Sequence, residues 1–166
     1  MGQCQERTAP SNFMEVLPMS KKASHPHHRN LPLLLLQARE HVIAHFRPIL
    51  NAHGITEQQW RIVRVLLTTE PLEPREIGEL CSLSSPSLAG VLARMEELGF
   101  VTRRRFDDDR RRVHVSLTPR SRSLAKLMAP QIDETYREIE NQLGPELWLR
   151  LQKTLDDLVQ VLAPSR

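Results

Sequence analysis

The chain has 166 residues, 40% of them hydrophobic and 26% charged, as expected for one compact domain with a short appendage. Aromatic residues make up only 4%, which argues against an RNA-binding module that stacks bases on aromatic rings. The net charge of +3 is small, so the position of the charges is more informative than their sum. The longest apolar run, Leu33–Leu36, is too short to span a bilayer. With only two cysteines and no secretory signal, we expect a cytoplasmic protein without a membrane partner.

Residues 1–30 mix prolines, serines and histidines without periodicity, which predicts a disordered leader. Histidines in such a segment are usually solvated. His41 and His45 are spaced as a metal-binding pair, but no third ligand is evident nearby. We therefore predict no metal site and no cofactor.

Three helices are expected in residues 31–81. The first has apolar residues at a helical period from Leu33 to Leu50. The second begins with a capping box, in which Thr56 and Gln59 satisfy each other's backbone amides. The third, residues 74–80, is expected to bury Ile77 and Leu80, and Cys81–Ser84 forms the turn that follows.

A fourth helix is predicted to start at Ser85 as N-cap, with Pro86 in its first position, and to end at Gly99. Its apolar positions face inward, whereas its polar face carries small residues and one cation: Ser84, Ser85, Ser87, Gly90 and Arg94. Small side chains allow a helix to approach the edges of base pairs closely. This face is typical of a DNA-recognition helix.

Two strands follow, and the turn between them is highly charged. Residues 103–112 contain six arginines and three aspartates, and Val113, Val115 and Leu117 alternate with polar residues. Arginines on a protruding ribbon can enter the minor groove of DNA, where negative potential is concentrated. We expect Arg103–Arg105 to contact phosphate or solvent. The alternative is a solvated loop.

Two more helices end the chain. Thr118 and Pro119 begin the first of these, with Pro130 inside it, and the second has leucines spaced as a partner-facing seam at 147, 151, 155, 158 and 162. The order of four helices, two strands and two helices predicts a mainly α fold with a small β-wing, a winged helix-turn-helix. We assign 57–118 to the DNA-binding domain, and 31–56 with 119–166 to a helical region that forms a homodimer.

One wing motif is specific enough to indicate a family. Asp109-Arg110-Arg111, five residues to Ser116, and then Leu117-Thr118 match the D-x-R-x(5)-L-T signature of the MarR family of bacterial regulators, which the chain resembles over 32–163. The resemblance implies a homodimeric repressor of palindromic operator DNA that a small ligand releases. It also implies DNA contacts in the minor groove by Arg111, which Asp109 orients, and near the major groove at Ser84, Ser85, Pro86, Ser87 and Arg94. Arg105 and Arg110 belong to the same predicted surface.

Two further segments, LLLLQAREHVIAHFRPIL and ITEQQWRIVRVL, resemble the branch of this family that represses homoprotocatechuate (hydroxyphenylacetate) degradation operons. This resemblance implies a small aromatic carboxylate as effector. The candidate ligand-binding residues combine cations with an aromatic wall: Arg39, His45, Gln59, Trp60 and Arg64. The alternative is that Arg39 pairs with a surface carboxylate and that Trp60 is core.

Other functions remain as alternatives. The sequence has no nucleophile–base pair, phosphate loop or metal set, so we expect no enzyme. A regulator of stress or efflux genes would share the same fold, with Cys81 as a conceivable redox sensor, although a buried filler is favoured. An architectural DNA-binding protein would lack an effector altogether.

Overall fold

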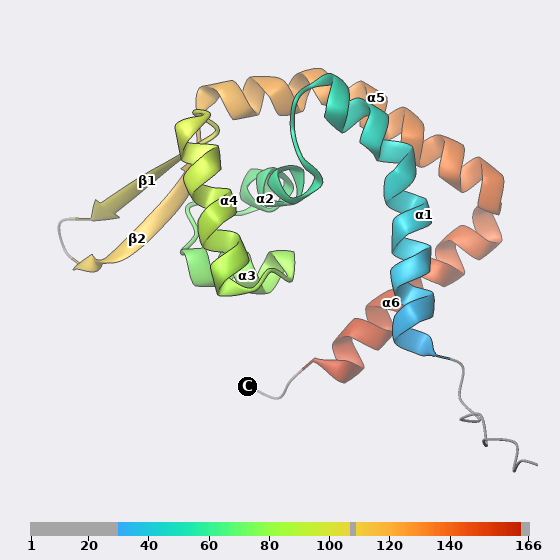
Figure 1. Cartoon of the computed structure of the whole chain (residues 1–166). Coiled ribbons are helices and arrows are strands. Elements are labelled where there is room, and N and C mark those ends of the chain that lie inside the picture. The colour runs from blue at the N-terminus through green and yellow to red at the C-terminus, as the bar shows by residue number, and fades with distance from the viewer. Residues whose placement is uncertain (1–29, 107–108, 164–166) are drawn as a thin grey trace, which may run out of the picture.

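The computed structural model describes residues 30–106 and 109–163, except the side chains of Phe106, Asp109, Arg110 and Arg111. The elements follow the predicted order: α1 (Leu31–Ala52), α2 (Glu57–Thr68), α3 (Pro74–Cys81), α4 (Ser85–Glu97), β1 (Val101–Phe106), β2 (Asp109–Leu117), α5 (Pro119–Leu143) and α6 (Pro145–Leu162). The hairpin lies at one side of the molecule, and α1 and α6 lie at the other (Figure 1). The mainly α fold with a small wing is confirmed. The predicted leader lies outside the described residues, apart from Asn30.

Side-chain caps fix where the helices begin. At the start of α2 the predicted capping box is present: the Thr56 hydroxyl accepts from the Gln59 amide at 3.3 Å, and Gln59 Oε1 accepts from the Thr56 amide at 2.9 Å. At the start of α5 the Thr118 hydroxyl accepts from the amide of Ser121 at 3.2 Å. These bonds satisfy amides that a helix leaves without partners in its first turn.

The turn between α3 and α4 is tight. A Cβ on Gly78 would lie 3.2 Å from the Leu83 carbonyl oxygen, so the close approach of α3 to this turn favours glycine. The N-cap of α4 is Ser84, one residue earlier than predicted, and its hydroxyl donates to that of Ser87 at 3.0 Å. The prediction for Leu80 is also wrong: Leu80 is 59% exposed, and Cys81 is buried in its place.

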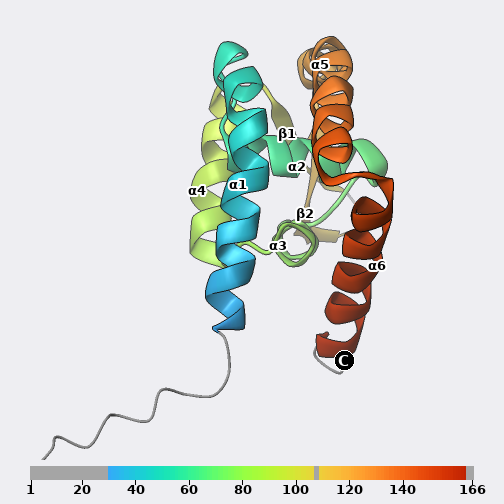
Figure 2. The same ribbon diagram turned by 90° about the vertical axis from the view of Figure 1, so that its right-hand side faces the viewer.

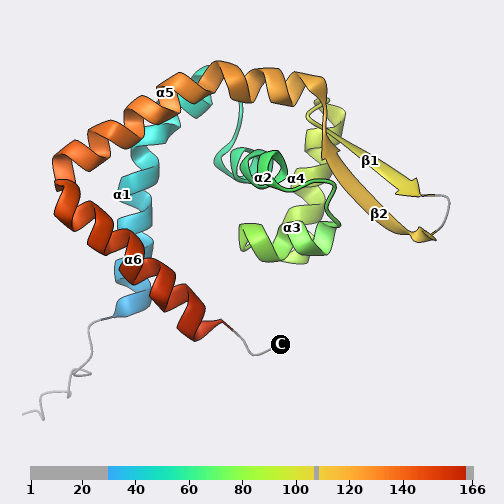
Figure 3. The ribbon, with the colours of Figure 1, turned by 180° about the vertical axis from the view of Figure 1, so that it is seen from behind.

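The wing is a two-stranded antiparallel sheet in which Val101 lies opposite Leu117 and Arg105 opposite Val113. Its root is fixed to the loop after α2, because Leu72 and Val115 exchange backbone hydrogen bonds of 3.2 and 2.8 Å. Val115 and Leu117 are buried, as the alternation predicts, whereas Val113 is only partly buried. Val101, opposite Leu117 on β1, is also buried. The far end of the hairpin projects away from the helices (Figure 3).

A continuous apolar core joins the winged helix to the long helices. Its fully buried members include Ile62, Leu66, Ile77, Leu92 and Met95 under the wing, and Leu50 and Met128 between α1 and α5. The last helix is different, because α6 has no buried residue and its leucine seam is largely exposed. Figure 2 shows α1 and α6 as separate columns along the same side of the molecule. No helix in the described part of the chain is long and apolar enough to cross a membrane.

Candidate DNA-binding face and ligand cavity

The predicted recognition face of α4 is exposed. Ser84, Ser85, Pro86 and Ser87 form the start of the helix, and Arg94 follows two to three turns later on the exposed surface. Arg94 pairs with Glu97 at 3.0 Å, and both side chains are 64% exposed. A pair this exposed contributes little to stability, so the guanidinium can exchange its partner at small cost.

The predicted DNA-binding residues of the wing lie on both strands. Arg105 is exposed on β1, and Asp109, Arg110 and Arg111 belong to β2, with side chains outside the described residues. Two other wing arginines form ion pairs with glutamates of the helical part. Arg103 is half-buried and pairs with Glu96 of α4 at 3.2 Å, which differs from the expected contact with phosphate or solvent. Arg112 pairs with Glu73 at the start of α3.

These two ion pairs connect the wing to both helices of the helix-turn-helix. The Arg103–Glu96 pair reaches α4, and the Arg112–Glu73 pair reaches α3. Together with the backbone hydrogen bonds between Leu72 and Val115, these pairs help to orient the hairpin relative to α3 and α4.

A cavity of about 710 Å³ opens between α1, α2, α5 and α6. Its wall is mainly apolar, with three arginines and one glutamate: Leu34, Leu35, Ala38, Arg39, Val42, Ile43, Phe46, Glu57, Trp60, Arg61, Arg64, Ile132, Tyr136, Leu151 and Leu155. This size is in the usual range for a pocket that holds a small organic molecule.

The cavity brings together three of the five residues predicted to bind a ligand, namely Arg39, Trp60 and Arg64. His45 is exposed on α1 and does not line the cavity. Gln59 is buried, and its side chain is used by the capping box. A ligand contact by any of these residues stays a prediction.

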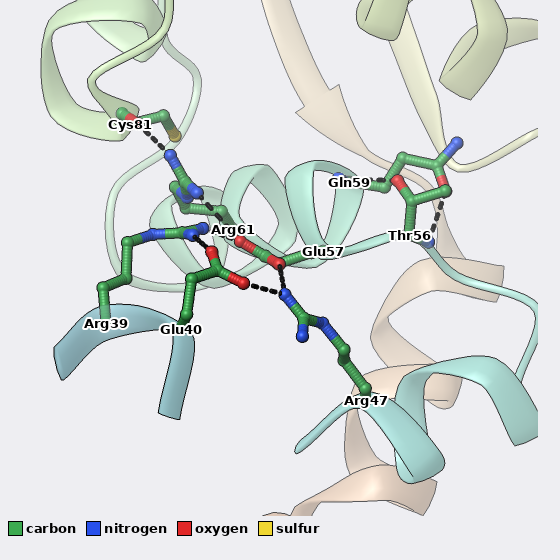
Figure 4. Close-up of polar contacts among 8 residues, drawn as sticks. All are labelled: Arg39, Glu40, Arg47, Thr56, Glu57, Gln59, Arg61 and Cys81. Atoms are coloured by element: carbon green, nitrogen blue, oxygen red, sulfur yellow. Dashed lines mark hydrogen bonds and ion pairs between the residues drawn. The ribbon is translucent and has the colours of Figure 1, made fainter. Parts of the chain in front are cut away.

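Beside the cavity, α1 and α2 are joined by what we call the arginine–glutamate cluster: Arg39, Glu40, Arg47, Glu57 and Arg61 (Figure 4). Arg39 pairs with Glu40 at 2.6 Å and also with Glu57. Glu57 lies 3.3 Å from Arg61 and 3.7 Å from Arg47. The hydrogen bond from Arg47 is the main reason why the pKa of Glu40 is lowered.

Arg64 lies outside this cluster. It is exposed at the cavity wall, and within the described residues its guanidinium has neither an ion pair nor a hydrogen bond. It follows Trp60 by four residues on α2, so both side chains lie on the same face. Phe46 and Tyr136 also line the cavity, and their ring centroids are 4.9 Å apart. An uncompensated cation beside aromatic side chains is a suitable site for an aromatic carboxylate.

The cysteine at the end of α3 is not activated. Burial raises the pKa of the Cys81 thiol, and the nearby charge of Arg61 only partly opposes this effect. A raised pKa leaves less reactive thiolate at neutral pH, so the position is suited to packing. Among the described residues no group of three or more His, Cys, Asp or Glu side chains is arranged to hold a metal ion.

Comparisons with known proteins agree with this geometry. A family model described as "MarR family" matches residues 53–112. The chain is 39% identical over 132 residues to the homoprotocatechuate degradative operon repressor of Escherichia coli, covering 80% of this chain and 89% of the repressor. It is 38% identical to the HTH-type transcriptional regulator FarR of Neisseria gonorrhoeae, covering 81% and 92%. The chain belongs to the MarR family.

A solved structure of NadR in complex with 4-hydroxyphenylacetate superposes with a TM-score of 0.72 at 36% identity, covering 84% of this chain and 99% of NadR. As a MarR family member, the protein is a transcriptional regulator with a winged helix fold that binds DNA as a dimer. The similar proteins are regulators and not enzymes.

Three polar residues of the cavity wall, Glu57, Arg61 and Tyr136, were not among the predicted site residues of this MarR protein. Glu57 and Arg61 are one helical turn apart on α2, a spacing that indicates an ion pair but not the cavity beside it. Tyr136 belongs to the apolar stripe of α5, and only the packing of α5 against α1 brings it to the cavity.

Proposed function

We propose that this MarR protein is a repressor that binds a two-fold symmetric operator as a homodimer and releases it when a small aromatic carboxylate occupies the cavity. The observation that carries the proposal is Arg64, a cation without a carboxylate partner among the described residues, in an apolar wall beside Trp60. The names of two similar proteins support it, since one represses a homoprotocatechuate operon and the other binds 4-hydroxyphenylacetate. Genes for aromatic-acid degradation are therefore the proposed targets.

The dimer would be formed by the helical region, residues 31–56 and 119–166. The exposed leucines of α6 and of the start of α1 support this assignment, because a large apolar surface on a water-soluble protein marks an interaction site. A two-fold axis through these helices would place two copies of α4 in successive major grooves of a palindrome. A regulator of chromosomal DNA acts where the DNA is, so we also propose a cytoplasmic location.

For DNA, we propose that α4 contacts bases through Ser85, Ser87 and Arg94, and that the wing enters the minor groove through Arg111, oriented by Asp109. The exposed, weakly paired Arg94 supports the first assignment. The position of Arg111 on the projecting hairpin supports the second.

The test uses a DNA duplex selected from random sequences by binding to the protein. We expect its dissociation constant to rise at least about fivefold with saturating 4-hydroxyphenylacetate, the lower end of typical coupling between sites. The amide analogue, 4-hydroxyphenylacetamide, should have no effect on the affinity for DNA.

Arg64→Met should weaken 4-hydroxyphenylacetate binding at least about tenfold in calorimetry, because a charge-assisted hydrogen bond is lost. Arg137→Met, a matched change on α5 outside the cavity lining, should not.

If no sequence is selected and neither acid nor amide changes DNA affinity, the protein is an architectural DNA-binding protein without an effector. If a sequence is selected but 4-hydroxyphenylacetate and homoprotocatechuate leave its affinity unchanged, the proposed effector class is wrong. A regulator of other genes, such as those for stress or efflux, would then be the better description.

A further inference from the structure

Two arginines of α2 line the cavity, and in the described part of the chain one of them, Arg61, is hydrogen-bonded to α3. Arg61 and Arg64 both belong to α2 and to the cavity wall. Within the described residues the guanidinium of Arg64 has no partner, whereas that of Arg61 has two. One of its nitrogens donates to the Cys81 carbonyl oxygen at 2.8 Å, and the other to Glu57 Oε1 at 3.3 Å (Figure 4).

The Cys81 carbonyl lies at the junction between α3 and the turn that leads to α4. Cys81 is the last residue of α3, where helix carbonyls lack partners within the helix and the helix dipole favours a cation. Ser82 then turns the chain in a left-handed conformation with φ of 50°, and α4 begins at Ser85. Arg61 therefore fixes the end of α3 immediately before the recognition helix.

On the side of the cavity, Arg61 belongs to a charged cluster. The arginine–glutamate cluster has three cations against two carboxylates, so it retains one positive charge beside the cavity. An anion that enters the cavity competes with Glu57 for Arg39 and Arg61. Any change in the pairing of Arg61 alters its bond to the Cys81 carbonyl, because one planar guanidinium makes both contacts.

We propose that Arg61 is the positioning residue that couples an anion in the cavity to the α3–α4 turn, and so to DNA affinity. The inference rests on the proposed function, since it explains how the same cavity controls the same DNA-binding surface. Arg64 binds the carboxylate, and the change in the pairing of Arg61 alters the hydrogen bond to the Cys81 carbonyl.

The experiment measures the coupling factor, which is the ratio of the dissociation constants for the selected duplex with and without saturating 4-hydroxyphenylacetate. Arg61→Met keeps an unbranched apolar side chain but removes the guanidinium and with it both contacts. We expect it to bind duplex in the absence of acid and to bind 4-hydroxyphenylacetate more weakly than wild type, because one cation of the cavity wall is lost. At saturating acid its coupling factor should be below about two. Arg64→Met should instead lose binding of the acid itself. Cys81→Ala keeps the carbonyl and should retain wild-type coupling.

An Arg61→Met protein with wild-type coupling would overturn the inference. If that variant fails to fold or to bind duplex, Arg61→Lys decides the question. Lysine keeps the charge at the end of α3 but lacks the planar fork, so we expect at least a threefold smaller coupling factor, and an unchanged factor would overturn the inference. If the wild-type protein itself shows no coupling, the proposed function fails and the inference falls with it.

Discussion

Arg111 stands on the projecting hairpin and is the residue on which the proposed minor-groove contact depends. Arg111→Ala should weaken binding to all duplexes, because a contact with the minor groove and its phosphates is mainly electrostatic. Since each protomer of a dimer supplies one copy, the slope of log affinity against log salt should fall by about two. Titration of labelled duplex at several salt concentrations measures both quantities.

The matched control is Arg137→Ala on α5, which should leave the slope unchanged because its partner is Glu134 on the same helix. A wild-type slope in the Arg111→Ala protein would mean that the wing does not contact DNA through this residue.

Glu40 makes the stability of the protein depend on pH. The hydrogen bond from Arg47 lowers the pKa of Glu40 in the folded protein below the ordinary value of 4.5. A carboxyl with a lowered folded pKa stabilises the fold above its ordinary pKa, and this stabilisation is lost as the pH falls toward the folded pKa. Glu40→Gln should therefore be less stable than wild type at pH 7, and the difference should shrink below pH 4.5.

Urea unfolding of both proteins at a series of pH values measures this difference. Because Glu40 is on the surface, the effect should also diminish in high salt. A difference that stays constant across the acidic range would show that the Arg47–Glu40 pair does not stabilise the protein in solution.

The arginines also show what the sequence can predict about single residues. It identified Arg39 and Arg64 as cations near an aromatic wall, and both line the cavity. It could not rank them, because the ranking depends on Glu57, which is distant in the chain from Arg39. Glu57 pairs with Arg39, whereas Arg64 has no carboxylate partner among the described residues.

At the scale of elements, the capping box makes a direct prediction for α2, the helix that carries four residues of the cavity wall. Thr56→Ala removes the oxygen that accepts from the Gln59 amide and should lower the free energy of unfolding by about 1 kcal/mol. Thr56→Ser keeps that oxygen and should lower the free energy of unfolding much less. Urea denaturation of the two variants compares them, and equal losses would mean that the methyl group of Thr56 matters and the cap does not.

Elements were predictable where caps and periodicity agreed, as in α2 and α5. The errors have local physical reasons. Ser84 and Ser85 are chemically equivalent as N-caps, so the sequence could not choose between them. The short helix α3 is oriented so that Ile77 and Cys81, four residues apart, face the core, and Leu80 consequently faces solvent.

At the scale of the whole molecule, the cavity could not be located from the sequence. Its wall combines residues from Leu34 to Leu155, and only the packing of α5 against α1 and α2 brings them together. The leucine seam of α6 was visible in the sequence as a stripe, because its period alone identifies a face that needs a partner.

Two seam residues test the dimer without touching the cavity wall. Leu158 and Leu162 belong to the seam and do not line the cavity, and Leu162 is 69% exposed. The double change Leu158→Asp and Leu162→Asp should shift the protein toward monomer in sedimentation experiments, because a dimer would bury two carboxylates per chain in an apolar interface. A monomer presents only one copy of α4, so affinity for the selected duplex should fall at least about a hundredfold.

The control is Lys153→Asp, on the opposite side of α6, which should change neither the oligomeric state nor the affinity for duplex. A double variant that remains dimeric would exclude this seam as the interface, and a monomer with undiminished affinity would exclude the two-fold symmetric mode of DNA binding.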